Sequence, residues 1–357
     1  MTHMYKLLLL VFLIPLAITA TEKKGKYTKN KELNKEYIVS SDATINLSNK
    51  YGSINITTWE ENRIVIKVSI TTNGNDEDKV AAKLEQIDVE FTGNSDNVSA
   101  KTLIEKSSRS WSLWGKNNNV SMEINYLVKM PVSNNLDVSM DYGSVTLDKL
   151  EGSSKIDCDY GSLHIGELLN SKNYINIDYT NKSTIDFMKD GEINADYSTL
   201  NLEKSGRTTL NADYSHIIFG LLSNLDYNCD YGSLTINEVG NITGNSDYMH
   251  TKIETLLGSG NFDSDYGSVK IGNLASNFKE LSIESSYASV KIGIENVTAF
   301  DFSANLNYTG FKKLDGFNFT KEIVKNTSKQ YEGYFGESGS NKNIIIKSSY
   351  GSVTFNN

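Results

Sequence analysis

The chain contains very little cysteine or proline, with two of each in 357 residues. Two cysteines exclude a disulfide-built scaffold and a zinc site made of cysteine ligands. Proline removes a backbone hydrogen bond from any strand that it enters, and the two prolines are Pro15 and Pro131, so the stretch from 132 to 357 has none. The hydrophobic fraction is a modest 38%, yet 20 tyrosines make the chain too aromatic for a disordered one.

Positive charge is also scarce. The chain has 35 Lys and Arg against 44 Asp and Glu, which gives a net charge of −9. Because phosphate binding needs clustered Lys and Arg, this composition excludes a nucleic-acid partner.

Long apolar runs are missing, apart from one at the start of the chain. Leu7 to Ile18 is an apolar run that follows Lys6; it is too short to span a bilayer and is typical of a secretory signal. We expect residues 1–20 to be a signal peptide cleaved near Ala20, with an uncleaved anchor as the alternative. Export would place the protein in the periplasm, on the outer cell surface or outside the cell. The mature chain would have no transmembrane span and, without Lys6, a net charge of −10.

Internal repetition is the strongest pattern in the chain. From 142 to 308 a tyrosine recurs every 17 to 21 residues, and a step of 42, twice 21, leads to the last copy. Gly-Ser follows many of these tyrosines, and Tyr51-Gly52-Ser53 is an outlying copy. The repeated tyrosines are Tyr142, Tyr160, Tyr179, Tyr197, Tyr214, Tyr231, Tyr248, Tyr266, Tyr287, Tyr308 and Tyr350.

Apolar and polar residues alternate on both sides of each tyrosine, as Ile156, Leu163 and Ile165 do around Tyr160. Such alternation predicts short strands with one buried face, and a unit this short buries that face only by stacking on its neighbours. The pattern predicts an all-β parallel β-helix (β-solenoid) of 17–21 residues per rung over 131–357. We expect a right-handed coil because the strict hexapeptide pattern of left-handed coils is absent.

The direction of the tyrosines is a separate question. The residue two before each tyrosine is mostly small, which favours tyrosines that stack inside a tight coil. Tyrosines that point outward would instead form an aromatic stripe for sugars or proteins.

Residues 21–130 lack the repeat. Residues 21–36 are rich in lysine and are expected to be a flexible leader. Residues 37–130 alternate like strands and are expected to be a β-rich cap domain over the first coil, since an open coil end exposes unpaired strand edges. One short helix is expected from Asp76 to Gln86, capped by Asn75 or Asp76. Pro131 marks the domain boundary.

Several of these features occur together in known proteins. They are the export signal, the segment Tyr51-Gly52-Ser53-Ile54-Asn55-Ile56, the junction Val128-Lys129-Met130-Pro131 and the Asp-Tyr-Gly-Ser-Val repeats. In them the chain resembles the adhesin β-helix families of bacterial envelopes, which are related to the head domain of auto-transporter-like adhesins and occur in Bacteroidetes-type genomes. The resemblance covers about residues 37–357. It implies a surface protein, and it offers no catalytic residues.

An aspartate precedes eight successive tyrosines of the repeat. Like charges stacked one coil apart destabilise a fold unless they are neutralised, hydrogen-bonded or solvated. One hypothesis is a stripe that binds Ca²⁺, whose hard charge suits carboxylates. The alternative is that each aspartate accepts hydrogen bonds from backbone N–H groups of the following turn. These residues are Asp141, Asp159, Asp178, Asp196, Asp213, Asp230, Asp247 and Asp265.

Three further sets of residues are candidates. Trp111 and Trp114 lie on a short segment beside Gly115 that would form an exposed contact loop or pack over the end of the coil. Cys158 and Cys229 share one repeat position four rungs apart, about 19 Å, which is beyond disulfide reach, so both are expected to be buried thiols. Asparagines three before the tyrosine are expected to form an amide ladder or to bind glycans.

The function expected from these patterns is that of a non-catalytic envelope or surface protein, an adhesin or a scaffold that displays a binding face to a protein or glycan. No cofactor is expected beyond the Ca²⁺ hypothesis. Enzymes that cleave acidic polysaccharides combine irregular carboxylates with an Arg or Lys base, whereas here the carboxylates are uniform and Arg207 is the lone arginine of the repeats. Such an enzyme stays an alternative, as does an envelope-stress accessory protein that acts through a protein partner.

Overall fold

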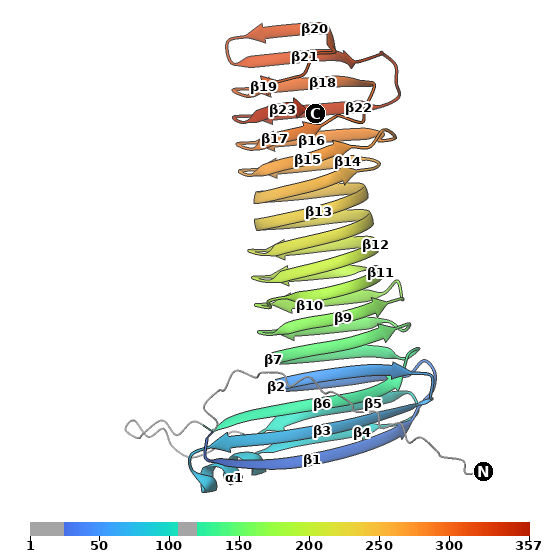
Figure 1. The fold of residues 1–357 in the computed structure, drawn as a ribbon, viewed down its shortest axis with the longest axis vertical. Helices are drawn as coiled ribbons and strands as arrows, with labels where there is room; N and C mark the ends of the chain where they lie inside the picture. The colour runs from blue at the N-terminus through green and yellow to red at the C-terminus, as the bar shows by residue number, and fades with distance from the viewer. Residues whose placement is uncertain (1–24, 106–119) are drawn as a thin grey trace, which may run out of the picture.

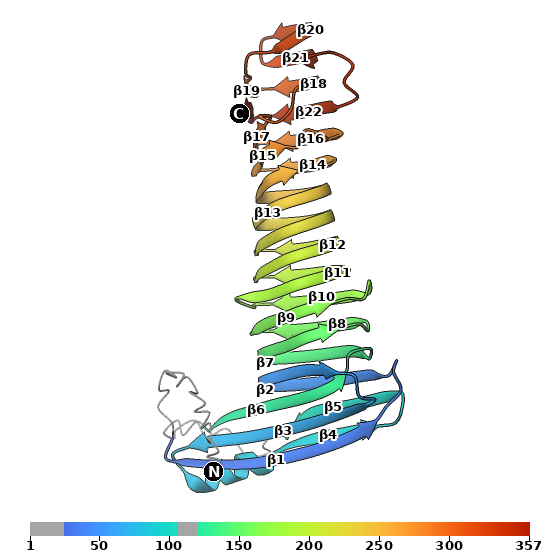
Figure 2. The same ribbon diagram turned by 45° about the vertical axis from the view of Figure 1, so that its right-hand side comes forward.

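The computed structural model describes residues 25–105 and 120–357, and these form an all-β structure with one helix. Figures 1 and 2 show a tall stack of strands on a broader base. The predicted signal peptide, residues 1–20, lies outside the described residues. Among the described residues, no helix is both long and apolar enough to cross a bilayer.

Parallel pairing between successive repeats builds the stack. Equivalent positions lie opposite one another, so that Ile156 pairs with Ile175, Ile175 with Ile193, and Ile193 with Leu210. This is the pairing that the repeat predicts. The strands are β7 (Asn135–Leu150), β8 (Ser154–Asp159), β9 (Ser162–Leu168), β10 (Asn173–Asp178), β11 (Ser183–Asp196), β12 (Thr199–Asp213), β13 (His216–Leu256), β14 (Gly260–Asp265), β15 (Ser268–Leu274), β16 (Glu280–Ser286) and β17 (Ser289–Gly293).

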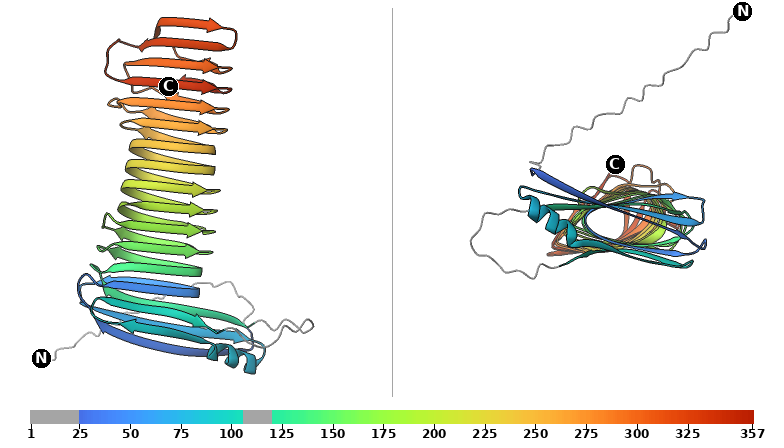
Figure 3. Two further views of the ribbon diagram at one scale, coloured as in Figure 1. Left: turned by 180° about the vertical axis from the view of Figure 1, so that it is seen from behind. Right: turned by 90° about the horizontal axis from the view of Figure 1, so that it is seen from below.

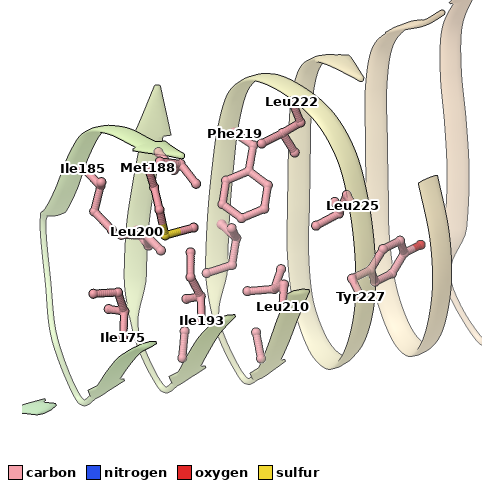
Figure 4. Packing of buried hydrophobic residues seen from close by; sticks show 14 of the residues in the cluster. Ile175, Ile185, Met188, Ile193, Leu200, Leu210, Phe219, Leu222, Leu225 and Tyr227 are labelled. Atoms are coloured by element: carbon pink, nitrogen blue, oxygen red, sulfur yellow. The ribbon is translucent and has the colours of Figure 1, made fainter. Parts of the chain in front are cut away.

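The apolar residues of the alternation fill the inside of the stack. Ile175, Ile193 and Leu210 are almost fully buried, and Phe219 points into the same interior from the opposite wall (Figure 4). Each coil is therefore a thin layer, and its hydrophobic surface is covered only by the coils above and below it.

The base is made from the N-terminal part of the chain. Its elements are β1 (Tyr27–Ile38), β2 (Thr44–Trp59), β3 (Arg63–Gly74), α1 (Glu77–Glu85), β4 (Ile87–Gly93), β5 (Asn97–Ile104) and β6 (Ser121–Pro131). β1, β3 and β6 pair antiparallel in that order, and β4 pairs antiparallel with β5. α1 lies beneath these strands (Figure 3), and the Asp76 carboxylate caps it by accepting a hydrogen bond from the Lys79 N–H, as predicted.

Two expectations for this region are wrong. Residues 27–38 are not part of a flexible leader but form β1, which pairs with β3 along its whole length. Most of its side chains are polar or charged, with Lys29 paired to Glu77 and Lys31 to Asp88. This composition is why the sequence did not indicate a strand here. β2 is not confined to a cap domain: it pairs in parallel with β7 as the first coil of the stack, with Ile45 opposite Leu136.

The order of coils also departs from chain order at the other end. The C-terminal strand β22 (Asn343–Ser349) pairs with β16 on one side and with β18 (Phe300–Asn307) on the other. β23 (Ser352–Asn356) lies likewise between β17 and β19 (Gly310–Lys312). The hairpin of β20 (Phe317–Lys325) and β21 (Ser328–Phe335) then closes the end, with β21 antiparallel to β18. The last segment of the chain is therefore inserted into the stack.

Candidate functional site

Twelve tyrosines of the described residues stack ring on ring along one line of the coil; we call them the tyrosine ladder. Neighbouring ring centroids are 4.8–5.2 Å apart and the planes differ by 1–12°. In stacking order they are Tyr51, Tyr142, Tyr160, Tyr179, Tyr197, Tyr214, Tyr231, Tyr248, Tyr266, Tyr287, Tyr350 and Tyr308. The ladder extends for about 50 Å, since each coil adds about 4.8 Å.

The prediction that these tyrosines point inward is wrong, because 38–57% of each side chain is exposed. The reason is local backbone geometry. Every ladder tyrosine has a φ between +49° and +61°, which is the left-handed region that L-residues seldom adopt. The chain turns at that residue, both where a strand ends just before it and where the strand continues through it, as β13 does through Tyr231. The in–out alternation is therefore interrupted at the tyrosine.

Backbone hydrogen bonds hold this turn in place from coil to coil. The Tyr160 N–H donates to the Asp178 carbonyl at 2.9 Å, and the Tyr197 N–H donates to the Asp213 carbonyl at 2.9 Å. The residue after the tyrosine approaches the neighbouring coil closely. At Gly161 a Cβ would lie 1.6 Å from the Gly143 carbonyl oxygen, so the Tyr-Gly-Ser pattern reflects this close approach.

The stacking decides what the ladder presents to a ligand. Offset parallel rings at this separation attract one another, and each inner ring is partly covered on both faces by its neighbours. The exposed surface therefore consists largely of ring edges and hydroxyl groups. No hydrogen bond between described residues involves a ladder hydroxyl, so these groups are available to solvent or to a bound molecule.

A second row of side chains runs beside the ladder; we call it the aspartate ladder. It contains the eight predicted aspartates, and the structure brings them together in register, with Asp141 opposite Asp159, Asp178 opposite Asp196, and Asp247 opposite Asp265. All eight are at least partly exposed. Further along the row the position is taken by Ser286, Ser349 and Asn307.

Hydrogen bonding satisfies only some of these carboxylates within the described residues. The Asp213 N–H donates to Asp196 Oδ1 and the Asp247 N–H donates to Asp230 Oδ1, both at 3.1 Å. Asp178 Oδ1 has no partner. Asp196 and Asp230 thus accept backbone N–H groups, as the alternative expected, but the donor is the equivalent residue of the next coil and not the following turn.

The charges in the row act on one another. Burial raises the pKa of Asp159, Asp178, Asp213 and Asp265, and neighbouring aspartates raise it further. One end of the row is compensated, since Lys50 Nζ lies 2.6 Å from Asp141 Oδ2. The row is therefore a strip of negative potential beside the ring edges.

Metal binding is a weaker match. Across residues 25–105 and 120–357, no group of three or more His, Cys, Asp and Glu side chains is placed to hold a metal ion. A Ca²⁺ ion takes six to eight oxygen ligands, whereas the carboxylates of two neighbouring aspartates carry four oxygens. The Ca²⁺ hypothesis stays a prediction.

The other predicted residues lie apart from the ladder or outside the description. Trp111 and Trp114 are outside the described residues. Cys158 and Cys229 are free, buried and four coils apart, as predicted, and burial raises the pKa of each to about 12. The asparagine ladder is partial: the Asn211 Nδ2 donates to Asn194 Oδ1 at 2.8 Å.

The tyrosine ladder is what sequence reasoning placed wrongly. The sequence did contain a sign of the outward direction, because a tyrosine followed by glycine or a small residue between two strands is typical of a turn. The small residues two before each tyrosine favoured the inward direction instead. The extent of the ladder was also hidden, since Tyr51 extends one end and Tyr350 lies inside the other.

Comparisons with known proteins give little further guidance. No family model matches the chain, and no curated protein does. Matches among solved structures include a "putative cell adhesion protein" from Clostridium sporogenes, with 12% identity, coverage of 92% of this chain and 99% of that one, and a TM-score of 0.19. A "putative adhesin" from Bacteroides fragilis has 10% identity, coverage of 91% and 97%, and a TM-score of 0.23. A "putative lipid binding protein" from Parabacteroides distasonis has 14% identity, coverage of 91% and 97%, and a TM-score of 0.26. Likeness at this level assigns neither a family nor an activity.

Proposed function

We propose that this protein is a non-catalytic envelope or surface protein that binds an extended ligand along its coil, as an adhesin or display scaffold. The tyrosine ladder is the observation that supports this best. With about half of each tyrosine exposed, twelve of them offer on the order of 1,000 Å² of contiguous aromatic surface. Contiguous exposed apolar patches above a few hundred Å² commonly mark interaction sites on proteins.

The backbone strain points the same way. A left-handed conformation costs an L-residue about 1–2 kcal/mol, and the chain adopts it at every tyrosine of the ladder. Strain of this kind persists where the surrounding structure enforces it and is concentrated at functional sites. A turn needed only for the fold would be met at lower cost by glycine.

Two structural proposals accompany this function. Export follows from the apolar run of residues 7–18 behind Lys6, which makes the periplasm, the outer surface or the exterior the site of action. The coil is a right-handed parallel β-helix, because strand connections between parallel strands of one sheet are right-handed in the great majority of proteins. The crossing sense in an experimental electron-density map checks the handedness.

A glycan array probed with purified residues 21–357, run beside a lyase and hydrolase screen on the same polysaccharides, tests the proposal. We expect binding to extended glycans without cleavage. Binding that is unchanged when ladder tyrosines are replaced would place the ligand elsewhere and overturn the role of the ladder.

The enzyme alternative has one specific location. A shallow hollow of about 780 Å³ on the strands that precede the tyrosines is lined by Asp137, Lys155, Tyr174, Glu192 and Arg207 among others. It combines carboxylates with the lone arginine of the repeats. Cleavage of any polysaccharide in the screen, abolished by Arg207→Ala or Glu192→Gln, would favour this alternative. A protein partner captured without any glycan binding would favour the accessory-protein alternative.

A further inference from the structure

The charge beside the tyrosine ladder is uncompensated over most of its length. Among the described residues, the ion pair of Lys50 with Asp141 is the one that reaches the aspartate ladder. The seven aspartates from Asp159 to Asp265 have no ion pair with a described residue, and each lies one coil from the next and is at least partly exposed. A partner for this strip therefore has to supply positive charge that repeats along the coil axis.

The ladder itself also favours a cation. The electron-rich faces of the inner rings are covered by their neighbours, but the exposed hydroxyl oxygens can accept hydrogen bonds from ammonium groups. Burial raises the pKa of Tyr197 and Tyr231, and neighbouring tyrosines and the adjacent aspartates raise it further. The ladder hydroxyls have no hydrogen-bond partner among the described residues, so they can also bond to the hydroxyl groups of a ligand.

The third property is the one-dimensional repeat. Rings recur every 4.8–5.2 Å along the coil, so one chain of repeating units can meet equivalent groups on successive coils. Linked contacts of this kind raise the overall affinity well above that of a single contact.

We infer that the tyrosine ladder and the aspartate ladder together bind a linear polysaccharide with free amino groups, which lies along the coil axis. Its ammonium groups meet the aspartates, its hydroxyl groups bond to the tyrosine hydroxyls, and its C–H surface lies against the ring edges. This inference rests on the proposed function and names the chemical class of its ligand.

The test measures binding of glucosamine oligomers of two to eight units to the purified full-length mature protein by calorimetry. Affinity is expected to rise about 100-fold or more with length. N-acetylated oligomers of equal length, which lack the charge, are expected to bind at least tenfold more weakly, and salt is expected to weaken only the charged series.

Matched variants locate the site. The triple variant Asp196→Asn, Asp213→Asn and Asp230→Asn keeps an amide oxygen as acceptor for the next coil but removes three charges, and it is expected to lose at least tenfold in affinity. The triple variant Asp186→Asn, Glu203→Gln and Glu254→Gln makes the same charge change on strands that follow the tyrosines, and it is expected to bind as the parent does.

A third triple variant, Tyr197→Phe, Tyr214→Phe and Tyr231→Phe, keeps the stacked rings and removes three hydroxyls. It is expected to bind glucosamine oligomers several-fold more weakly with unchanged thermal unfolding. This separates ligand contact from a purely structural role of the ladder.

Three other outcomes would contradict the inference, and they differ in what they leave standing. Equal binding of N-acetylated oligomers would overturn the cationic ligand and leave the proposed function standing. Equal binding of an oligolysine of matched charge would show a general polycation surface and overturn the polysaccharide. If neither these oligomers nor any sugar on the glycan array binds, the inference and the proposed function both fall.

Discussion

Each ladder tyrosine combines a strained backbone with a favourable side chain. The left-handed φ costs about 1–2 kcal/mol, whereas offset stacking on a neighbouring ring contributes about 0.5–1.5 kcal/mol beyond the area that it buries. The N–H of the same residue donates to the next coil, as that of Tyr160 does to the Asp178 carbonyl. Stacking and this hydrogen bond together hold a conformation that an isolated tyrosine would avoid.

This balance predicts an unusual order of stability for substitutions of Tyr197. Tyr197→Ala loses the stacked ring and keeps the strain, while Tyr197→Gly loses the ring and relieves the strain. We expect the glycine variant to be more stable than the alanine variant by about 1 kcal/mol, measured by urea unfolding.

Thr209, an exposed strand residue of β12, provides the control for that comparison. There the glycine variant should be the less stable one, because glycine in a strand loses more chain entropy and has no side chain to pack. Equal stabilities of the two Tyr197 variants would show that the tyrosine position is not strained.

At the scale of the strands, neighbouring coils approach closely at the residue that follows each tyrosine. At Gly161 an added Cβ would meet the Gly143 carbonyl oxygen at 1.6 Å, and backbone cannot move aside as a side chain can. We expect Gly161→Ala to destabilise the protein by about 1–3 kcal/mol, as overpacking does elsewhere. The measurement is the midpoint of thermal or urea unfolding.

Gly310 is the matched control for this substitution. The nearest atom to its Cβ would be 3.8 Å away, so Gly310→Ala should leave the midpoint within experimental error. Similar effects of the two substitutions would contradict the close approach of coils at Gly161.

The aspartate ladder makes the stability of the fold depend on pH in the direction opposite to that of most carboxylates, whose pKa is lowered by folding. Burial, with a further contribution from Asp196, raises the pKa of Asp178 above its ordinary value of 3.8. At a pH between the unfolded-state pKa and the raised folded-state pKa of Asp178, the folded chain binds more protons than the unfolded chain. The stability from protonated Asp178 is therefore complete below the unfolded-state pKa and is lost as pH rises through the folded-state pKa.

Replacing Asp178 with asparagine removes this dependence. Asp178→Asn is expected to raise stability at pH 7 by only a few tenths of a kcal/mol, because solvent screens the charge of this partly exposed residue, and the gain should vanish near pH 3. Asp88 is the control, since Lys31 lowers its pKa. Asp88→Asn should lower stability at pH 7, with the difference lost as pH falls through the folded-state pKa. A gain for Asp178→Asn that persists at pH 3 would contradict the electrostatic cause.

For the molecule as a whole, the inserted C-terminal segment links two parts of the stack. β22 lies between β16 and β18, and the Tyr350 ring lies between those of Tyr287 and Tyr308. The coil therefore cannot be completed until the end of the chain arrives. Antiparallel strands close the stack at both ends, which covers edges that would otherwise pair with other chains.

Truncation tests this order of coils. A chain ending at Ser340 should lose hydrogen-exchange protection in β16 and β18 together, because each strand loses β22, one of its two partners. Replacing residues 316–336, the β20–β21 hairpin, by a short Gly-Ser linker should expose only β18. If β16 kept full protection in the truncated chain, β22 would not be its partner in solution.

Local pattern was sufficient to predict much of this architecture. The period of 17–21 residues, the parallel stacking of like positions and the burial of Cys158 and Cys229 follow from the spacing of apolar and small residues. A thin coil has one inside, and every repeat must place its apolar residues there. The helix near residue 80 was also predictable, since its cap and its apolar spacing lie within a few consecutive residues.

Three features could not be predicted from local pattern, because they depend on pairing with distant parts of the chain or on the φ angle of one residue. The outward direction of the tyrosines follows from the left-handed turn at each of them, which breaks the count of alternating residues. β1 is identified as a strand only by its pairing with β3, and β2 as a coil only by its pairing with β7. The sequence by itself determined the repeating unit, because its signals are local. Only the tertiary structure decided the order of the coils and the face on which the tyrosines lie, because these depend on contacts between residues far apart in the chain.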